Sequence, residues 1–164
     1  MKKYLKYFLY SLIYLILIFV FAIMFIVTTR ADVIKPNNVI EPYQVVKIQL
    51  RSLKNNDDPF QNAGIEQTWE FAHPNNKKFT GPLEKFKILL NSDSYKMLLN
   101  HVEHNIIEVK TTDSQAAYEV TILGEEKNYY KFRWIVEKYE LDGPLNGCWL
   151  TTGVSPPVSL GSSI

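Results

Sequence analysis

The sequence predicts an α+β domain that follows an apolar N-terminal helix, and three observations lead to this prediction. An uncharged apolar run occupies residues 8–27. Between residues 42 and 101 apolar residues recur at helical spacing, and after His101 they alternate as in β-strands. Because the helices precede the strands instead of alternating with them, we predict helices packed on a curved antiparallel sheet of about four strands.

The apolar run from Phe8 to Val27 reads FLYSLIYLILIFVFAIMFIV, and no charged residue falls between Lys6 and Arg30. About twenty apolar residues in a helix match a hydrocarbon core of about 30 Å, and a helix satisfies its own backbone groups in lipid. We therefore predict a single-pass transmembrane anchor in residues 1–30, with the lipid bilayer as a partner. Two alternatives are a secretory signal cleaved near Thr29-Arg30-Ala31 and a helix buried in a soluble core.

The charges that flank the apolar run predict its orientation. Lys2, Lys3 and Lys6 precede it, whereas Arg30 and Lys35 follow it. Basic residues are enriched on the inner side of a membrane. We therefore predict that the N-terminus lies inside and that the C-terminal domain lies on an extracytoplasmic, lumenal or intermembrane-space side.

The remaining chain divides into a linker at 31–41, a domain at 42–154 and a flexible tail at 155–164 that is rich in Ser, Pro and Gly. Pro42 suits the first turn of a helix, and Val46, Leu50 and Leu53 form its apolar stripe. A second helix is predicted over 63–72 and a third from Pro82 onward. The polar residues 75–80 between them are predicted to form a loop.

Four strands are predicted over 102–110, 115–123, 129–139 and 148–154. The alternation is clearest in the third, where one face carries aromatic and β-branched residues and the other carries charged residues. A hairpin loop at 124–128 joins the second strand to the third. The predicted sheet therefore has one strongly aromatic face that the helices can cover.

The composition excludes several classes of function. Only three of the 18 Lys and Arg residues precede residue 30, and all 17 acidic residues follow it, so the domain carries a small negative charge. Such a charge does not suit nucleic-acid binding. The single cysteine, Cys148, excludes an internal disulfide and any multi-cysteine metal site. We find no glycine pattern typical of dinucleotide, phosphate or serine-nucleophile sites, and we predict no cofactor and no metal.

Five blocks of sequence resemble an uncharacterised family catalogued as domain of unknown function 4864. The blocks are QLRSLKNND (49–57), AGIEQTWEFAHPNN (63–76), TGPLEKF (80–86), SYKMLLNH (94–101) and GCWLTTGV (147–154). The resemblance covers residues 42–154 and implies no established activity. The order of helices and strands is also similar to the nuclear-transport-factor-2-like fold, which implies a cone that holds a pocket.

Few residues are candidates for chemistry. His101 follows an apolar run at the junction of helices and strands, where burial can tune a general base; the alternative is a structural histidine bonded to a backbone carbonyl. His104 is predicted to face away from His101, because an offset of three in a strand reverses the face. Asp57 and Asp58 are adjacent carboxylates that suit acid–base work or, alternatively, a turn. A ligand pocket is predicted from five aromatic residues that can also simply form the core: Trp69, Tyr118, Tyr130, Phe132 and Trp134.

These observations leave three hypotheses of function. The first is a membrane-anchored, non-catalytic module that binds a protein partner or supports a membrane complex. The second is a protein that binds a small apolar ligand such as a lipid or a pigment. The third is an isomerase, dehydratase or hydrolase on the cone fold that uses His101 or Asp57.

Overall fold

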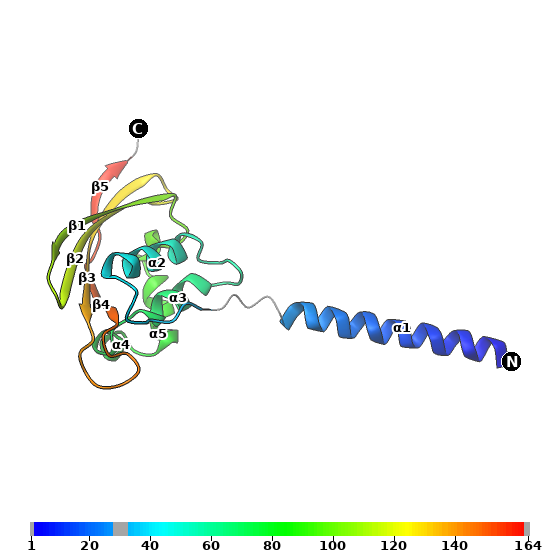
Figure 1. The fold of residues 1–164 in the computed structure, drawn as a ribbon. Helices are drawn as coiled ribbons and strands as arrows, with labels where there is room; N and C mark the ends of the chain where they lie inside the picture. The colour runs from blue at the N-terminus through cyan, green and yellow to red at the C-terminus, as the bar shows by residue number, and fades with distance from the viewer. Residues whose placement is uncertain (1, 28–32, 163–164) are drawn as a thin grey trace. The chain divides into compact units, whose positions relative to one another are not determined.

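The computed structural model describes residues 2–27 and 33–162 of the chain. The chain forms two units, residues 1–32 and residues 33–164, and each is described by itself. Figure 1 shows the helix of the first unit and the helices and strands of the second. The segment Thr29-Arg30-Ala31, where a cleavage site was considered, lies outside the described residues.

The first unit contains the helix α1 (Lys2–Val27). Among the residues that the structure describes, no helix is both long enough and apolar enough to cross a lipid bilayer. This finding contradicts the predicted transmembrane anchor, and with it the single-pass topology and its orientation.

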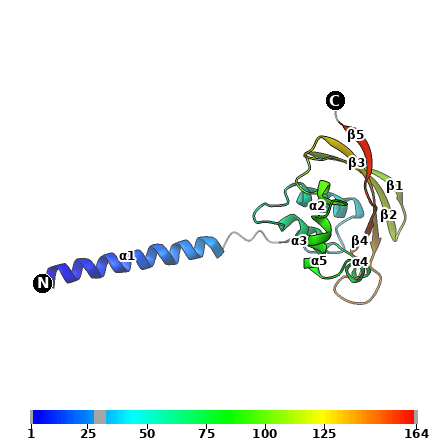
Figure 2. The same cartoon turned by 180° about the vertical axis from the view of Figure 1, so that it is seen from behind.

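The second unit is an α+β domain. Its helices are α2 (Pro42–Lys54), α3 (Ala63–Glu70), α4 (Pro74–Thr80), α5 (Leu83–Leu90) and the single 3₁₀ turn η1 (Lys96–Leu98). Its strands are β1 (Glu103–Thr111), β2 (Gln115–Leu123), β3 (Asn128–Lys138), β4 (Trp149–Val154) and β5 (Val158–Ser162). Figures 1 and 2, which view the molecule from opposite sides, both show the helices on one face of a curved sheet.

The sheet is antiparallel, and its strand order is β1-β2-β3-β4, with β5 paired to β3. One half of β3 pairs with β4, where Trp134 lies opposite Val154. The other half pairs with β5, where Lys131 lies opposite Val158. The two C-terminal strands therefore share one edge of β3, and the long strand β3 holds the sheet together.

Helix α2 is the central helix of the domain, and its sequence explains both its start and its buried face. Pro42 occupies the first helical position, and Glu41 and Gln44 form a capping box in which the Glu41 N–H donates to Gln44 Oε1 at 2.9 Å. The side chains of Val46, Leu50 and Leu53 are fully buried, which confirms the predicted stripe. This stripe packs on the buried face of the sheet.

The buried face of the sheet is the aromatic face that alternation predicts. In β2 the residues Tyr118, Val120 and Ile122 are fully buried, and in β3 Phe132 and Trp134 are each 1% exposed. The opposite face of the same strands is polar and includes an ion pair between Lys131 and Glu119. The predicted bounds of these strands agree with the structure to within one residue.

Helix α4 forms where the polar composition predicts a loop. Pro74 is at its first position, and the ring Nδ1 of His73 accepts a hydrogen bond from the Asn75 N–H at 3.1 Å. The Asn76 side chain also donates to the Thr151 carbonyl on β4 at 3.2 Å. A helix of only seven residues, most of them polar, is unstable alone, and here capping and a tertiary contact stabilise it.

Strand β5 forms where the composition predicts a flexible tail. The half of β3 at Asn128–Lys131 extends past β4 and would leave its backbone groups unpaired at an edge. Residues 158–162 fill that edge, and the hydroxyl of Ser162 donates to Asn128 Oδ1 at 3.1 Å. Backbone pairing of this kind needs no alternating side-chain pattern, so composition did not indicate it.

Candidate ligand cavity

A cavity of about 310 Å³ lies between the helices and the buried face of the sheet. Its walls come from the helices α2, α3, α4, α5 and η1 and from the strands β3 and β4, so both the helical layer and the sheet contribute. Its buried part is apolar and is lined by Leu53, Phe86, Leu90 and Leu98, which are at most 7% exposed. Small-molecule sites typically have volumes of about 300–1,000 Å³, so this cavity is at the small end of that range.

A cluster of buried polar groups forms another part of the wall. The side-chain oxygen of Gln49 accepts hydrogen bonds from Trp134 Nε1 at 3.0 Å and from the Thr151 hydroxyl at 2.7 Å. The amide nitrogen of Gln49 donates to the Thr68 carbonyl at 3.0 Å. One side chain on α2 therefore connects α3, β3 and β4, and the Trp134 ring is held in place on the cavity wall.

The hydroxyl of Thr68 differs from these groups in its hydrogen bonding. Thr68 lines the cavity and is 4% exposed, yet its Oγ1 atom has no hydrogen-bond partner among the described residues. Nearly all buried polar atoms in proteins are hydrogen-bonded, and an unpaired buried hydroxyl costs about 1–3 kcal/mol. The hydroxyl oxygen is itself buried in its described position, so it can supply a hydrogen bond to a molecule in the cavity when the Thr68 side chain rotates.

The rim of the cavity is half-exposed and comes from α4, the turn before η1 and the end of β4. Phe79 on α4 is 93% exposed and is the most exposed of the lining side chains for which exposure is described. Tyr95, in the turn before η1, donates a long hydrogen bond of 3.4 Å from its hydroxyl to the Val154 carbonyl. Burial raises the pKa of Tyr95, so its hydroxyl is neutral at physiological pH.

The residues that line the cavity share one electrostatic property. None of them is Asp, Glu, Lys, Arg or His. Within the described part of the chain, the cavity therefore contains hydroxyl, amide and indole groups but no formal charge. It offers neither a counter-ion for a charged ligand nor a carboxyl or imidazole group for proton transfer.

The five aromatic residues predicted to line a pocket divide into three groups. Trp134 lines the cavity. Tyr118 and Phe132 are part of the core and are absent from the cavity wall. Trp69 and Tyr130 are partly buried against the core, and the Trp69 ring packs on Phe86 with centroids 5.0 Å apart. Alternation predicts which face a ring occupies but not whether the helices cover it fully, so only one of the five lines the cavity.

His101 is buried at the junction of helices and sheet, with 1% exposure. Its Nδ1 atom lies 2.7 Å from the Leu98 carbonyl oxygen, and its Nε2 atom lies 2.7 Å from His104 Nδ1. Because a carbonyl only accepts, His101 Nδ1 carries the proton, and Nε2 accepts from the His104 N–H. Burial lowers the pKa of His101 to about 4, so the ring is neutral at pH 7. This arrangement matches the structural alternative considered for His101.

The contact between His101 and His104 differs from the prediction that the two rings face apart. The strand β1 starts at Glu103, so His101 precedes it and the alternation rule does not connect the two residues. Burial, Lys54 and Arg51 lower the pKa of His104. No group of three or more His, Cys, Asp or Glu side chains in the described residues is arranged to hold a metal ion.

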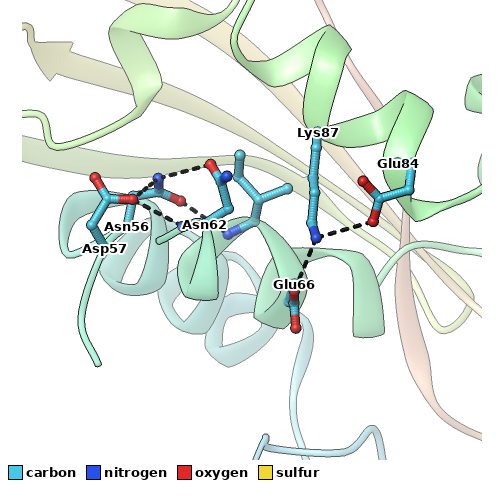
Figure 3. A network of polar contacts seen from close by, with 7 residues as sticks. Asn56, Asp57, Asn62, Glu66, Glu84 and Lys87 are labelled. Carbon is cyan, nitrogen blue, oxygen red and sulfur yellow. Dashed lines mark hydrogen bonds and ion pairs between the residues drawn. The ribbon is translucent and has the colours of Figure 1, made fainter. Parts of the chain in front are cut away.

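Asp57 lies in the loop between α2 and α3, away from the cavity, and its carboxylate accepts three hydrogen bonds. The donors are the Asn62 N–H at 2.9 Å, the Asn56 side chain at 2.9 Å and the Asn100 side chain at 3.1 Å. These hydrogen bonds, that from the Asn62 backbone first, lower the pKa of Asp57. Figure 3 shows Asp57 next to Asn56, with the hydrogen bonds that its carboxylate accepts from Asn56 and Asn62. The carboxylate thus organises the loop.

The same view shows how α5, one wall of the cavity, is held against α3. Lys87 on α5 forms ion pairs with Glu66 on α3 at 3.0 Å and with Glu84 on its own helix at 3.1 Å (Figure 3). Lys87 is thereby directed away from the cavity that its neighbours Phe86 and Leu90 line. The ion pairs hold the Lys87 ammonium group between Glu66 and Glu84, so Lys87 adds no charge to the cavity wall.

Sequence reasoning missed Gln49, Thr68 and Thr151. A signal for Gln49 was available, because it lies three residues after Val46 and four before Leu53, within the buried stripe of α2. A polar side chain on a buried stripe needs buried hydrogen-bond partners. Thr68 and Thr151 carry no comparable signal, because their roles depend on which segments of the fold meet.

The fold and this site define an α+β domain with a mostly apolar internal cavity between its helices and its sheet. Comparison of the chain with protein-family models, with curated proteins and with solved structures finds no match.

Proposed function

We propose that the domain of residues 33–162 binds one small, mostly apolar molecule in the cavity between its helices and its sheet. The observation that carries this proposal is a cavity of about 310 Å³ whose buried part is lined by core residues and whose rim is open to solvent. An engineered apolar cavity of about 150 Å³ in another protein binds benzene, so this volume suits roughly twice as many non-hydrogen atoms. A cavity of this size also lowers stability unless a ligand fills it.

The preformed polar cluster supports binding at this site. Gln49, Trp134 and Thr151 hold one another, so the wall does not have to reorganise when a ligand enters. A preorganised wall reduces the entropy lost on binding. The half-exposed rim at Phe79 and Tyr95 provides an approach from solvent.

Binding is better supported than catalysis. Both candidates for acid–base chemistry, His101 and Asp57, are absent from the cavity wall. Their polar atoms are engaged with Leu98, His104 and the asparagines of the loop. The hypothesis of a protein partner stays a prediction.

The test uses the purified full chain, stripped of bound molecules by organic extraction and refolded. A panel of uncharged apolar probes with six to twelve non-hydrogen atoms is screened by native mass spectrometry and thermal unfolding. We expect saturable one-to-one binding, with a ligand at one hundred times its Kd raising stability by about 2.7 kcal/mol.

A pair of variants on α5 assigns the binding to the cavity. Leu90→Trp places a larger ring at a lining position that is 5% exposed, whereas Ile88→Trp changes a 73% exposed position on the same helix. We expect the first variant to weaken binding at least tenfold and the second to leave it unchanged. Equal binding by both variants, or no probe binding to the wild type, contradicts the proposal.

A further inference from the structure

The chemistry of the cavity wall narrows the class of ligand, and this step rests on the proposed function. Among the described residues that line the cavity there is no charged side chain. Two lysines on the helices of the wall are engaged elsewhere, since Lys87 pairs with Glu66 and Lys77 lies over the Trp69 ring at 5.2 Å. A carboxylate, phosphate or ammonium group inside the cavity would lose its hydration and find no opposite charge.

The hydrogen-bonding capacity of the buried wall is nearly used up within the protein. The Gln49 oxygen accepts from Trp134 and from Thr151, and the Gln49 amide donates to the Thr68 carbonyl. The Thr68 hydroxyl is the group left over, because it is 96% buried, lines the cavity and has no partner among the described residues. Threonine adopts two side-chain rotamers in a helix, so this hydroxyl can turn toward a ligand without distortion of α3.

We infer that the ligand is an uncharged molecule with an apolar body and a single hydroxyl or carbonyl oxygen, and that Thr68 on α3 binds this oxygen. The apolar body lies against Leu53, Leu90 and Leu98, which form the apolar part of the buried wall. A hydroxyl both donates and accepts, so Thr68 accommodates an alcohol or a ketone. The polar rim residues stay in contact with water and do not need the ligand as a partner.

The first test compares four probes of similar length on the full chain at pH 7.5. These are 1-octanol, octanoate, octylammonium and octane, with binding followed by calorimetry and by intrinsic tryptophan fluorescence, to which Trp134 on the cavity wall contributes. We expect 1-octanol to bind most tightly, and the two ions to bind at least about thirtyfold more weakly because their charge is desolvated without compensation. Octanoate binding as tight as that of 1-octanol would overturn the inference.

The second test removes the hydroxyl with little change of shape. Thr68→Val is expected to weaken 1-octanol binding about tenfold and to leave octane binding unchanged or tighter. Thr68→Ser, which keeps the hydroxyl, is the matched control and is expected to preserve the preference for 1-octanol over octane. An unchanged preference in the valine variant would also overturn the inference.

The outcomes separate this inference from the proposed function. If none of the four probes binds, the proposed function fails. If all four bind equally and Leu90→Trp blocks them, the cavity binds ligands but Thr68 does not select them. Thermal unfolding of the ligand-free variants is the folding control, and we expect Thr68→Val to be at least as stable as the wild type because it removes an unpaired buried hydroxyl.

Discussion

The Nε2 atom of His101 lies 2.7 Å from the Nδ1 atom of His104, and the Leu98 carbonyl on the other side of the His101 ring determines the direction of this hydrogen bond. His101 must be neutral for its Nε2 atom to accept this hydrogen bond. Burial makes the largest contribution to the lowered pKa of each ring, Lys54 on α2 lowers both pKa values further, and Arg51 lowers that of His104. The pair therefore makes the stability of the domain depend on pH.

We expect the free energy of unfolding to fall by about 2 kcal/mol between pH 7 and pH 5 through His101. The pKa of His101 is about 4 in the folded domain, whereas a histidine in the unfolded chain has the ordinary value of 6.5. The unfolded chain therefore binds the proton first as the pH falls. The stabilisation is thus complete above pH 6.5 and is lost between about pH 6.5 and pH 4. Burial also lowers the pKa of His73, which acts in the same direction.

Urea unfolding of the wild type and of His101→Asn at both pH values measures this effect. Asparagine can keep a donor to the Leu98 carbonyl but does not titrate. The variant should be less stable at pH 7 and should lose less stability at pH 5 than the wild type. Identical pH dependence in the two proteins would show that His101 is not the group responsible.

Gln49→Leu is expected to destabilise the domain by about 2–3 kcal/mol. The change leaves the Thr68 carbonyl without its Gln49 donor and removes the acceptor shared by Trp134 and Thr151. Gln61→Leu is the control, because Gln61 is exposed and should change stability by less than about 0.5 kcal/mol. Chemical denaturation followed by Trp fluorescence gives both values, and equal values would refute the role of the cluster.

Asp57→Ala is expected to lower the stability by about 1–2 kcal/mol, because Asn56 and Asn62 in the loop between α2 and α3, and Asn100 before β1, lose their acceptor. Asp58→Ala changes the adjacent exposed carboxylate, whose side chain has no hydrogen bond to the described residues, and should have little effect. Hydrogen exchange at the Asn62 amide reports on the loop directly. Unchanged protection of this amide in Asp57→Ala would contradict the structural role.

Gly64→Ala is expected to be among the most damaging small substitutions, at about 2–4 kcal/mol. An added Cβ would lie 2.6 Å from the Ser52 carbonyl carbon and 2.9 Å from the Asn56 Cα, so α3 could not pack closely on α2. Gly153→Ala is the control, since its Cβ would meet no atom within 4 Å. Similar melting temperatures of the two variants would disprove the close approach.

Local patterns were sufficient to predict most elements of the domain. The Val46, Leu50 and Leu53 stripe predicted α2, and alternation predicted β2 and β3, because a helix and a strand each present one face at a fixed period. Capping and edge pairing decided α4 and β5, which composition alone assigned to a loop and a tail. These two elements depend on contacts with β3 and β4 that lie far away in the sequence.

The sequence by itself determined an α+β order, a buried aromatic sheet face and a small negative net charge of the domain. The tertiary structure alone decided that His101 meets His104, that Asp57 organises a loop, and that Trp134 but not Tyr118 lines a cavity. The physical reason is that periodicity reports which way a side chain points along its own element. Whether the space beyond that side chain is filled depends on how separate elements pack, and the cavity with its unpaired Thr68 hydroxyl arises at that level.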